Sequence, residues 1–114
     1  MLDVYDGQIR RASHGIEVAT NDAQRADAYC NRAQSFLRDE DYDSAARELE
    51  KSVELGVSGD GCSCEPSNSL AFIYIDVTRQ YDRCWDLVHK TQGWKRKIAS
   101  EYVERLKKAS GRAG

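Results

Sequence analysis

The chain has 114 residues but only one proline, Pro66, two histidines and four cysteines. Domains built from β-strands alone normally need many turn residues, so the scarcity of proline favours helices, whose interiors exclude it. Four cysteines are fewer than a disulfide-stapled scaffold carries, and we therefore expect a reducing compartment and a cytoplasmic protein. No apolar run approaches the roughly 18 residues of a membrane-spanning helix, and residues 1–11 do not resemble a signal peptide. We expect neither a membrane protein nor Sec export.

The length indicates a single domain. A chain of this size buries roughly two-thirds of the surface that it exposes when unfolded, which suffices for one core, predicted over residues 1–110 with a tail at 111–114. The net charge is −2, yet residues 94–114 contain seven Lys/Arg and two Glu and carry +5, so residues 1–93 carry −7. Because Glu101 and Glu104 interrupt this basic segment, we interpret it as the complement of an acidic body and expect no nucleic-acid partner.

Helical spacing of apolar residues recurs along the chain. The predicted helices cover residues 3–19, 22–38, 42–55, 81–91 and 94–109, and a further one begins at Pro66. That further helix contains the apolar run 70–75, whose period alone fits a strand or a helix equally well. We favour a helix, because a lone strand would have no partner in this chain and isolated strands are unstable.

Two of these helices are joined by a very short turn at residues 39–41. A connection of about three residues forces its helices to pack as an antiparallel hairpin. Gly56 is placed to end the second of them in the left-handed conformation. A loop follows up to Pro66.

The dipeptide Tyr-Asp recurs at residues 5–6, 42–43 and 81–82, at intervals of 37 and 39. At each position it opens a predicted second helix of a hairpin. Intervals of this size indicate an internal repeat of helical hairpins.

The segment from Ala26 to Val57 resembles a tetratricopeptide repeat, a helix–turn–helix unit of about 34 residues with small and aromatic residues at fixed positions. Its small residues let large side chains of the facing helix lie close to the backbone. A fainter second unit has a turn that we predict to be one residue longer. The residues that define the two units are Tyr29, Ala33, Phe36, Tyr42, Ala45 and Leu49 in the first, and Ala71, Tyr74, Tyr81 and Cys84 in the second.

The resemblance implies an all-α fold, a stack of antiparallel helical hairpins with about two repeats. Residues 3–19 would form a partial capping helix, 22–56 the first repeat, 66–92 a degenerate second repeat, and 94–109 a C-terminal solvating helix. Two positions depart from the family pattern, since Arg32 replaces a leucine and Val57 the closing proline.

In tetratricopeptide proteins the first helices of successive units line a concave groove, and the resemblance implies the same here. It places eight residues in the groove: Asp27, Cys30, Gln34, Leu37, Arg38, Asn68, Phe72 and Ile75. The carboxylate-gripping subset of the family has a lysine and an asparagine where this chain has Cys30 and Gln34, so we expect no such clamp. A partner peptide with apolar anchors, extended or helical, fits this composition better.

The chain offers no grouping typical of an enzyme, and we predict no catalytic residues, cofactor or metal. His14 and His89 are the only histidines, and neither has a recognisable catalytic partner. Cys62 and Cys64 are separated by one residue, whereas zinc-binding pairs usually have two to four residues between them. We interpret Cys30 and Cys84 as small packing residues.

Residues Arg10-Arg11-Ala12-Ser13 resemble a recognition sequence of basophilic kinases. Because this stretch falls within a predicted helix, the sequence alone leads us to interpret the match as chance.

Three hypotheses for function remain at this point. The favoured one is a non-catalytic adaptor or scaffold that binds a peptide or helix of another protein. The second is a self-associating protein whose dimer is the functional unit, because fewer than three repeats are few for an independent solenoid. The third is a small metal or redox protein that uses Cys62 and Cys64.

Overall fold

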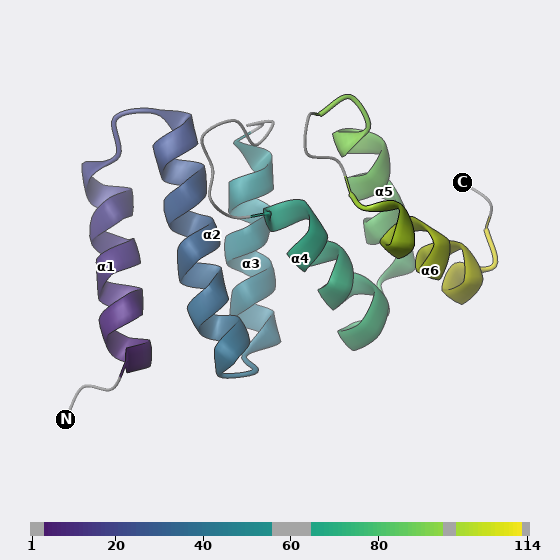
Figure 1. Cartoon of the computed structure of the whole chain (residues 1–114), viewed down its shortest axis with the longest axis horizontal. Helices are drawn as coiled ribbons and strands as arrows, with labels where there is room; N and C mark the ends of the chain where they lie inside the picture. The colour runs from purple at the N-terminus through teal and green to yellow at the C-terminus, as the bar shows by residue number, and fades with distance from the viewer. Residues whose placement is uncertain (1–3, 56–64, 95–97, 113–114) are drawn as a thin grey trace.

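The computed structural model describes residues 4–55, 65–94 and 98–112, which are all helix, turn or irregular chain without a strand (Figure 1). This confirms the predicted all-α class, and the run 70–75 is helical. Two helices have the predicted bounds, 22–38 and 81–91. In chain order the elements are α1 (Val4–Val18), α2 (Asp22–Arg38), α3 (Tyr42–Glu54), α4 (Pro66–Phe72), the π-helical turn η1 (Ile73–Val77), α5 (Tyr81–Thr91) and α6 (Ser100–Ser110).

Helices α2 and α3 lie side by side as an antiparallel hairpin (Figure 1). Two contacts fix their register: Ser52 Oγ donates to the Ala26 carbonyl at 2.8 Å, and Arg32 Nη2 donates to Glu48 Oε1 at 2.7 Å. From the first contact to the second, the α2 residue lies later in the sequence and the α3 residue lies earlier, as two antiparallel helices require. The three-residue turn therefore produces the antiparallel hairpin that the sequence predicted.

Small residues stand where the helices approach most closely. Ala33 of α2 and Ala45 of α3 are both fully buried, as the repeat pattern predicts. A Cβ placed on Gly15 of α1 would lie 3.4 Å from the Ala28 Cβ of α2, so this pair also allows a close approach. The first three helices thus stand as a layer in which backbones pack over small side chains.

The two inter-helix turns have the same backbone geometry. Glu40, between α2 and α3, has φ 57°, and Arg79, between η1 and α5, has φ 55°; each stands two residues before the tyrosine of a Tyr-Asp pair. After each turn the fourth helical N–H closes the same bond, from Ala45 to the Asp41 carbonyl and from Cys84 to the Gln80 carbonyl. Residues of the two turns therefore correspond at an interval of 39.

The π-helical turn η1 accounts for the additional residue of the second unit. Its last bond runs from the Thr78 N–H to the Ile73 carbonyl at 2.9 Å, five residues back instead of four. The repeat-defining residues of α4 and η1 lie 38 positions after their counterparts in α2, as Ala71 does after Ala33. The residues of the second turn lie 39 positions after those of the first turn. The extra residue lies in η1 and not, as the sequence suggested, in the turn.

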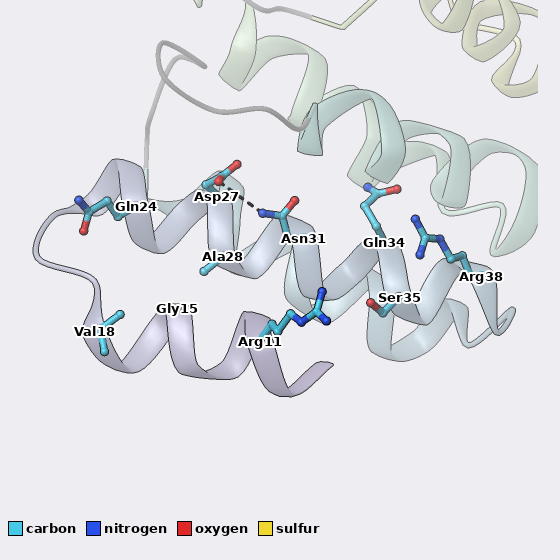
Figure 2. A pocket seen from close by; sticks show the side chains of 10 residues that line it. All are labelled: Arg11, Gly15, Val18, Gln24, Asp27, Ala28, Asn31, Gln34, Ser35 and Arg38. Atoms are coloured by element: carbon cyan, nitrogen blue, oxygen red, sulfur yellow. Dashed lines mark hydrogen bonds between the residues drawn. The ribbon is translucent and has the colours of Figure 1, made fainter. Parts of the chain in front are cut away.

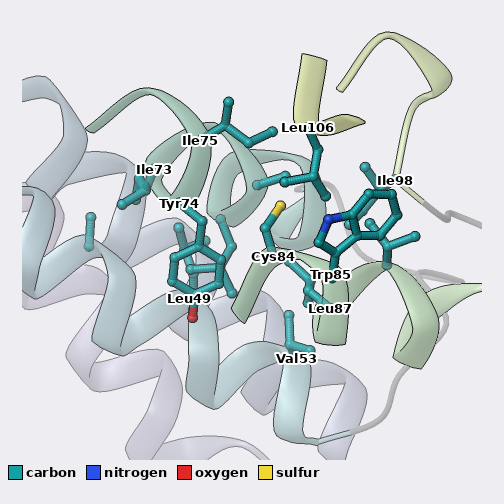
Figure 3. Close-up of a cluster of buried hydrophobic side chains, with 14 of the residues drawn as sticks. Leu49, Val53, Ile73, Tyr74, Ile75, Cys84, Trp85, Leu87, Ile98 and Leu106 are labelled. Carbon is teal, nitrogen blue, oxygen red and sulfur yellow. The ribbon is translucent and has the colours of Figure 1, made fainter. Parts of the chain in front are cut away.

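Helix α4, the turn η1 and helix α5 form what we call the second hairpin. A cluster of buried apolar side chains joins this second hairpin to α3 and α6 (Figure 3). Leu49 and Val53 of α3 enter it from one side and Leu106 of α6 from the other. Six of the ten repeat-defining residues are buried: Ala33, Ala45, Leu49, Ala71, Tyr74 and Cys84. The other four, Tyr29, Phe36, Tyr42 and Tyr81, are half-buried.

The C-terminal helix starts later than the sequence predicted. Its first residue is Ser100, whereas the pattern of residues 94–109 placed the start at Trp94. Ala99 has an extended backbone with ψ 142°, and its N–H donates to Asn68 Oδ1 at 2.8 Å, which holds the chain outside the helix at this point. Ile98 is buried although it precedes the helix, so helical spacing was the wrong explanation for its apolar character.

The predicted tail at 111–114 is held in place up to Arg112. Gly111 caps α6 with φ 71°, the left-handed conformation that glycine adopts without strain. Arg112 Nη1 lies 3.1 Å from Asp82 Oδ1, and its guanidinium lies 5.5 Å from the centre of the Trp85 ring. Gly56, Val57 and residues 113–114 lie outside the described residues.

Candidate protein-binding surface

A groove of about 700 Å³ runs between α1 and α2 (Figure 2). We call it the α1–α2 groove; it is lined by Arg11, Gly15, Val18, Gln24, Asp27, Ala28, Asn31, Gln34, Ser35 and Arg38. Its floor is narrow where Gly15 meets Ala28, because neither residue has a side chain that would separate the helices. Exposed Val18 lies toward one end and Arg38 toward the other.

Seven of the ten residues that line the α1–α2 groove have polar side chains. Asp27 Oδ2 accepts a hydrogen bond from Asn31 Nδ2 at 3.3 Å. Arg11 and Arg38 place two cationic groups along the half of the groove that lies farther from Val18.

A second hollow, of about 370 Å³, is lined in part by aromatic side chains. We call it the aromatic hollow; it is lined by Leu37, Tyr42, Glu65, Asn68, Ser69, Phe72 and Tyr102. These residues come from the end of α2, the start of α3, from α4 with the residue before it, and from α6. The rings of Tyr42 and Phe72 meet edge to face with their centres 6.4 Å apart. Three aromatic side chains and a leucine, each only partly buried, thus converge from four helices.

Asn68 on the rim of the aromatic hollow forms two hydrogen bonds within the protein. Its Oδ1 accepts the Ala99 N–H at 2.8 Å, and its Nδ2 donates to Glu65 Oε2 at 3.2 Å. The first bond holds the approach to α6 against α4, and the second joins Asn68 to the residue that precedes α4. The polar part of this rim is therefore preorganised rather than free to reorient.

The eight groove residues predicted from the sequence do not form one surface. Asp27, Gln34 and Arg38 line the α1–α2 groove, and Leu37, Asn68 and Phe72 line the aromatic hollow. Cys30 and Ile75 are buried, with exposed fractions of 1% and 5%. The sequence missed Tyr42 and Tyr102 as hollow-lining residues, because helical spacing placed both on apolar stripes and gave no sign that those stripes reach the surface.

The cysteines differ from the sequence expectation. Cys30 is disulfide-bonded, which corrects its interpretation as a free packing residue, although it is buried as that interpretation required. Cys84 carries a free, fully buried thiol, and burial raises its pKa to about 11. Cys62 and Cys64 lie outside the described residues.

A polar network that the sequence did not predict links the first three helices. Arg32 of α2 donates through Nη1 to Ser13 Oγ of α1 at 3.0 Å and through Nη2 to Glu48 Oε1 of α3 at 2.7 Å. Arg32 is the residue that replaces the family's leucine. The departure from the pattern is thus matched by Glu48, which gives the arginine a buried counter-charge.

A second polar contact joins the two hairpins on another face. The Tyr74 hydroxyl donates to Glu50 Oε1 at 2.7 Å, and Arg83 Nη1 lies 3.7 Å from the same oxygen. Burial, and next the hydrogen bond to Glu50, raise the pKa of Tyr74 well above its usual value. The phenol therefore stays protonated and donating across the whole physiological range.

The histidines and the acidic side chains of the described residues are spread over several helices rather than gathered at one site. Among these residues, no three His, Cys, Asp or Glu side chains gather as a metal site would require. His14 is exposed, and the exposed His89 lies over Trp85 with 6.0 Å between the ring centres. Within the same residues, no helix combines the length and the apolarity needed to cross a membrane.

In comparisons with known proteins, the chain matches no family model, no curated protein and no solved structure. The likeness to tetratricopeptide repeats thus rests on the residues and geometry of this chain alone.

Proposed function

We propose that this protein is a non-catalytic adaptor that holds a segment of another protein in the aromatic hollow. One observation carries the proposal: Leu37, Phe72 and Tyr102, from three separate helices, converge on one hollow without filling it. Partly exposed aromatic groups with a preorganised polar rim are what peptide-binding sites use, since rings bury much area at little entropic cost.

The repeated hairpin supports the finer part of the proposal, a tetratricopeptide-like stack. The turns before Tyr42 and Tyr81 share a left-handed residue and the same first helical bond. In such a stack the first helices of the hairpins, here α2 and α4, face a common partner. The aromatic hollow takes residues from both of these helices and from α6, which follows them.

The partner segment has a composition that the hollow predicts. Apolar side chains of the segment would pack between Phe72 and Tyr102, while Glu65 at the rim favours a basic group beside them. The buried Cys30 disulfide gives no support to the reducing, cytoplasmic location expected from the sequence, since disulfides persist mainly in oxidising compartments. We therefore leave location out of the proposal.

Substitution in the hollow tests the proposal. Tagged parent protein and a Phe72→Glu variant are used to capture partners, and the amount of each retained protein is compared. A partner bound in the hollow should be retained at least about tenfold less by Phe72→Glu, since hot-spot aromatics at interfaces are worth 2 kcal/mol or more.

Val18→Glu is the matched control, because Val18 is a 56% exposed apolar residue in the α1–α2 groove and not in the aromatic hollow. Circular dichroism and melting must show both variants folded. Equal loss with both variants, or loss with Val18→Glu alone, contradicts the assignment of the hollow. Recovery of the chain's own copies alone supports the self-association hypothesis instead.

A further inference from the structure

Ser13 takes part in a network that is held together by one guanidinium group. Arg32 donates from Nη1 to Ser13 Oγ at 3.0 Å and from Nη2 to Glu48 Oε1 at 2.7 Å. One positive charge therefore serves a neutral hydroxyl on α1 and a carboxylate on α3 at the same time.

The network is incompletely satisfied. Arg32 Nε and Glu48 Oε2 are buried and form no hydrogen bond within the described part of the chain. Glu48 is only 8% exposed, so it depends on Arg32 to offset the cost of burying its charge. Any group that attracts Arg32 more strongly than Glu48 would leave a buried carboxylate without a counter-charge.

Ser13 carries the hydroxyl of the network that can accept a phosphate. It is partly exposed and lies within α1, whose principal contact is with α2 alone, so a kinase would reach residues 10–13 through local opening of this helix. Arg10 and Arg11, both exposed, precede it at the spacing that basophilic kinases recognise. Arg10 also lies one helical turn before Ser13, on the same face of α1.

We propose that Ser13 is a phosphorylation site for an arginine-directed serine kinase, and that the phosphate withdraws Arg32 from Glu48. In the reaction Ser13 Oγ forms a bond to the γ-phosphorus of a nucleoside triphosphate while the bond from that phosphorus to the bridging oxygen breaks. The nucleoside diphosphate leaves, and the hydroxyl proton passes to a base of the kinase.

The charge balance gives the consequence. A phosphoserine carries about −1.5 to −2 charges and three strong acceptor oxygens, and it pairs with arginine more strongly than a single carboxylate oxygen does. One guanidinium cannot neutralise both anions. Glu48 is then buried without its partner, and the contact between α2 and α3 weakens.

The chain contains a matched comparison at its other end. Lys107-Lys108-Ala109-Ser110 has the same spacing of basic groups, but Ser110 Oγ accepts from Trp85 Nε1 at 3.0 Å and donates to the Leu106 carbonyl at 2.6 Å. Ser110 Oγ also accepts the Arg112 backbone N–H at 3.3 Å, but no arginine side chain and no buried carboxylate takes part in these bonds. Phosphate at Ser110 would therefore leave Arg32 and Glu48 paired.

The test incubates the full chain with an arginine-directed serine kinase and ATP, maps the phosphate by tandem mass spectrometry and measures Tm before and after. We expect phosphate at Ser13, none at that position in Ser13→Ala, and a fall in Tm of about 4 to 8 °C. In Glu48→Gln, which retains an acceptor for Arg32 but has no charge to leave unpaired, the fall should be less than half as large. Hydrogen exchange across α3 should rise on modification of the parent protein.

Absence of phosphate at Ser13, or incorporation at Ser110 alone, overturns the proposal. Equal falls in Tm for the modified parent and the modified Glu48→Gln variant overturn the proposed exchange of partners. If Glu48→Gln does not fold, the parent protein alone tests the proposal. Unchanged hydrogen exchange across α3 after phosphorylation of the parent would contradict the withdrawal of Arg32 from Glu48.

Discussion

The two hairpins follow one backbone plan with different side chains. In the first, α2 and α3 are joined by Arg32 with Glu48 and by Ser52 with the Ala26 carbonyl. Both hairpins also contribute to one buried apolar cluster, the second through Leu70, Ile73, Leu87 and Val88. The hairpins share the geometry of the turn and a small buried residue after it. We infer that these two features determine how the helices of each hairpin pair, whereas the remaining contacts can be polar or apolar.

The hairpins also differ at the start of their second helices. Asp41 accepts the Ser44 N–H at 3.3 Å, whereas Gln80 makes no side-chain bond to its helix. The first turn is therefore fixed by a capping residue. In the second turn the Thr78 hydroxyl bonds to Gln80 Oε1 at 2.9 Å and to the Ile73 carbonyl at 3.4 Å instead. The η1 turn absorbs the extra residue without disturbing this arrangement.

The largest expected effect compares Leu49 with Val88, which occupy the same position of the two hairpins at an interval of 39. Leu49→Ala removes three buried carbon atoms and should destabilise the protein by about 2 to 5 kcal/mol. Val88→Ala removes two and should cost less. Chemical denaturation of both variants measures the difference, and a larger loss for Val88→Ala would break the proposed correspondence.

Next come the small residues after the turns, Ala45 and Cys84, both fully buried. Ala45→Leu and Cys84→Leu should each cost about 1 to 3 kcal/mol by overpacking the place where two helices meet. Cys84→Ala serves as the control, because alanine is the residue that the first hairpin has there. Parent-like melting of Ala45→Leu would show that the crossing point is misplaced.

The contact between the hairpins comes third. Tyr74→Phe removes the hydroxyl that donates to Glu50 and should cost about 1 kcal/mol. Because the folded-state pKa of Tyr74 is raised, its contribution is present below the ordinary value of 10 and is lost as the pH rises above it. Denaturation at pH 8 and at about pH 11 should therefore show a steeper decline for the parent than for Tyr74→Phe. Identical declines would mean that Tyr74 does not contribute.

The smallest effect concerns α1, which packs on the first hairpin through Gly15. A Cβ at this position meets Ala28 at an ordinary contact distance, so Gly15→Ala should stabilise the protein by about 0.5 to 1 kcal/mol through helix propensity. Thermal melting provides the measurement. A loss of stability would show that the contact between α1 and α2 has no room for a methyl group at this position.

The sequence predicted those parts of the fold that depend on local chemistry. The short turn at residues 39–41 predicted the antiparallel hairpin, and Ala33 and Ala45 were predicted to allow a close helix crossing and are both fully buried. The spacing of apolar residues gave a wrong helix start where a contact with a distant residue sets the backbone conformation. At Ala99 this contact is the hydrogen bond to Asn68, which holds the residue outside the predicted helix.

The candidate surface was less predictable than the fold. Helical register identifies the residues that share one face of α2, but it cannot show that α1 and α4 cover different parts of that face. For this reason Asp27 and Leu37, predicted to share a groove, line separate hollows. The pairing of Arg32 with Glu48 depends on residues far apart in the sequence, for which spacing carries no signal.

The most direct test of the central claim is photo-crosslinking from the aromatic hollow. A benzophenone amino acid replaces Phe72 in one protein and Val18 in another, and crosslinked peptides are identified by mass spectrometry. The structure predicts that position 72 labels a defined apolar segment of a different protein and that position 18 does not. Equal labelling from both positions, or labelling from position 72 confined to a second copy of this chain, would contradict the claim.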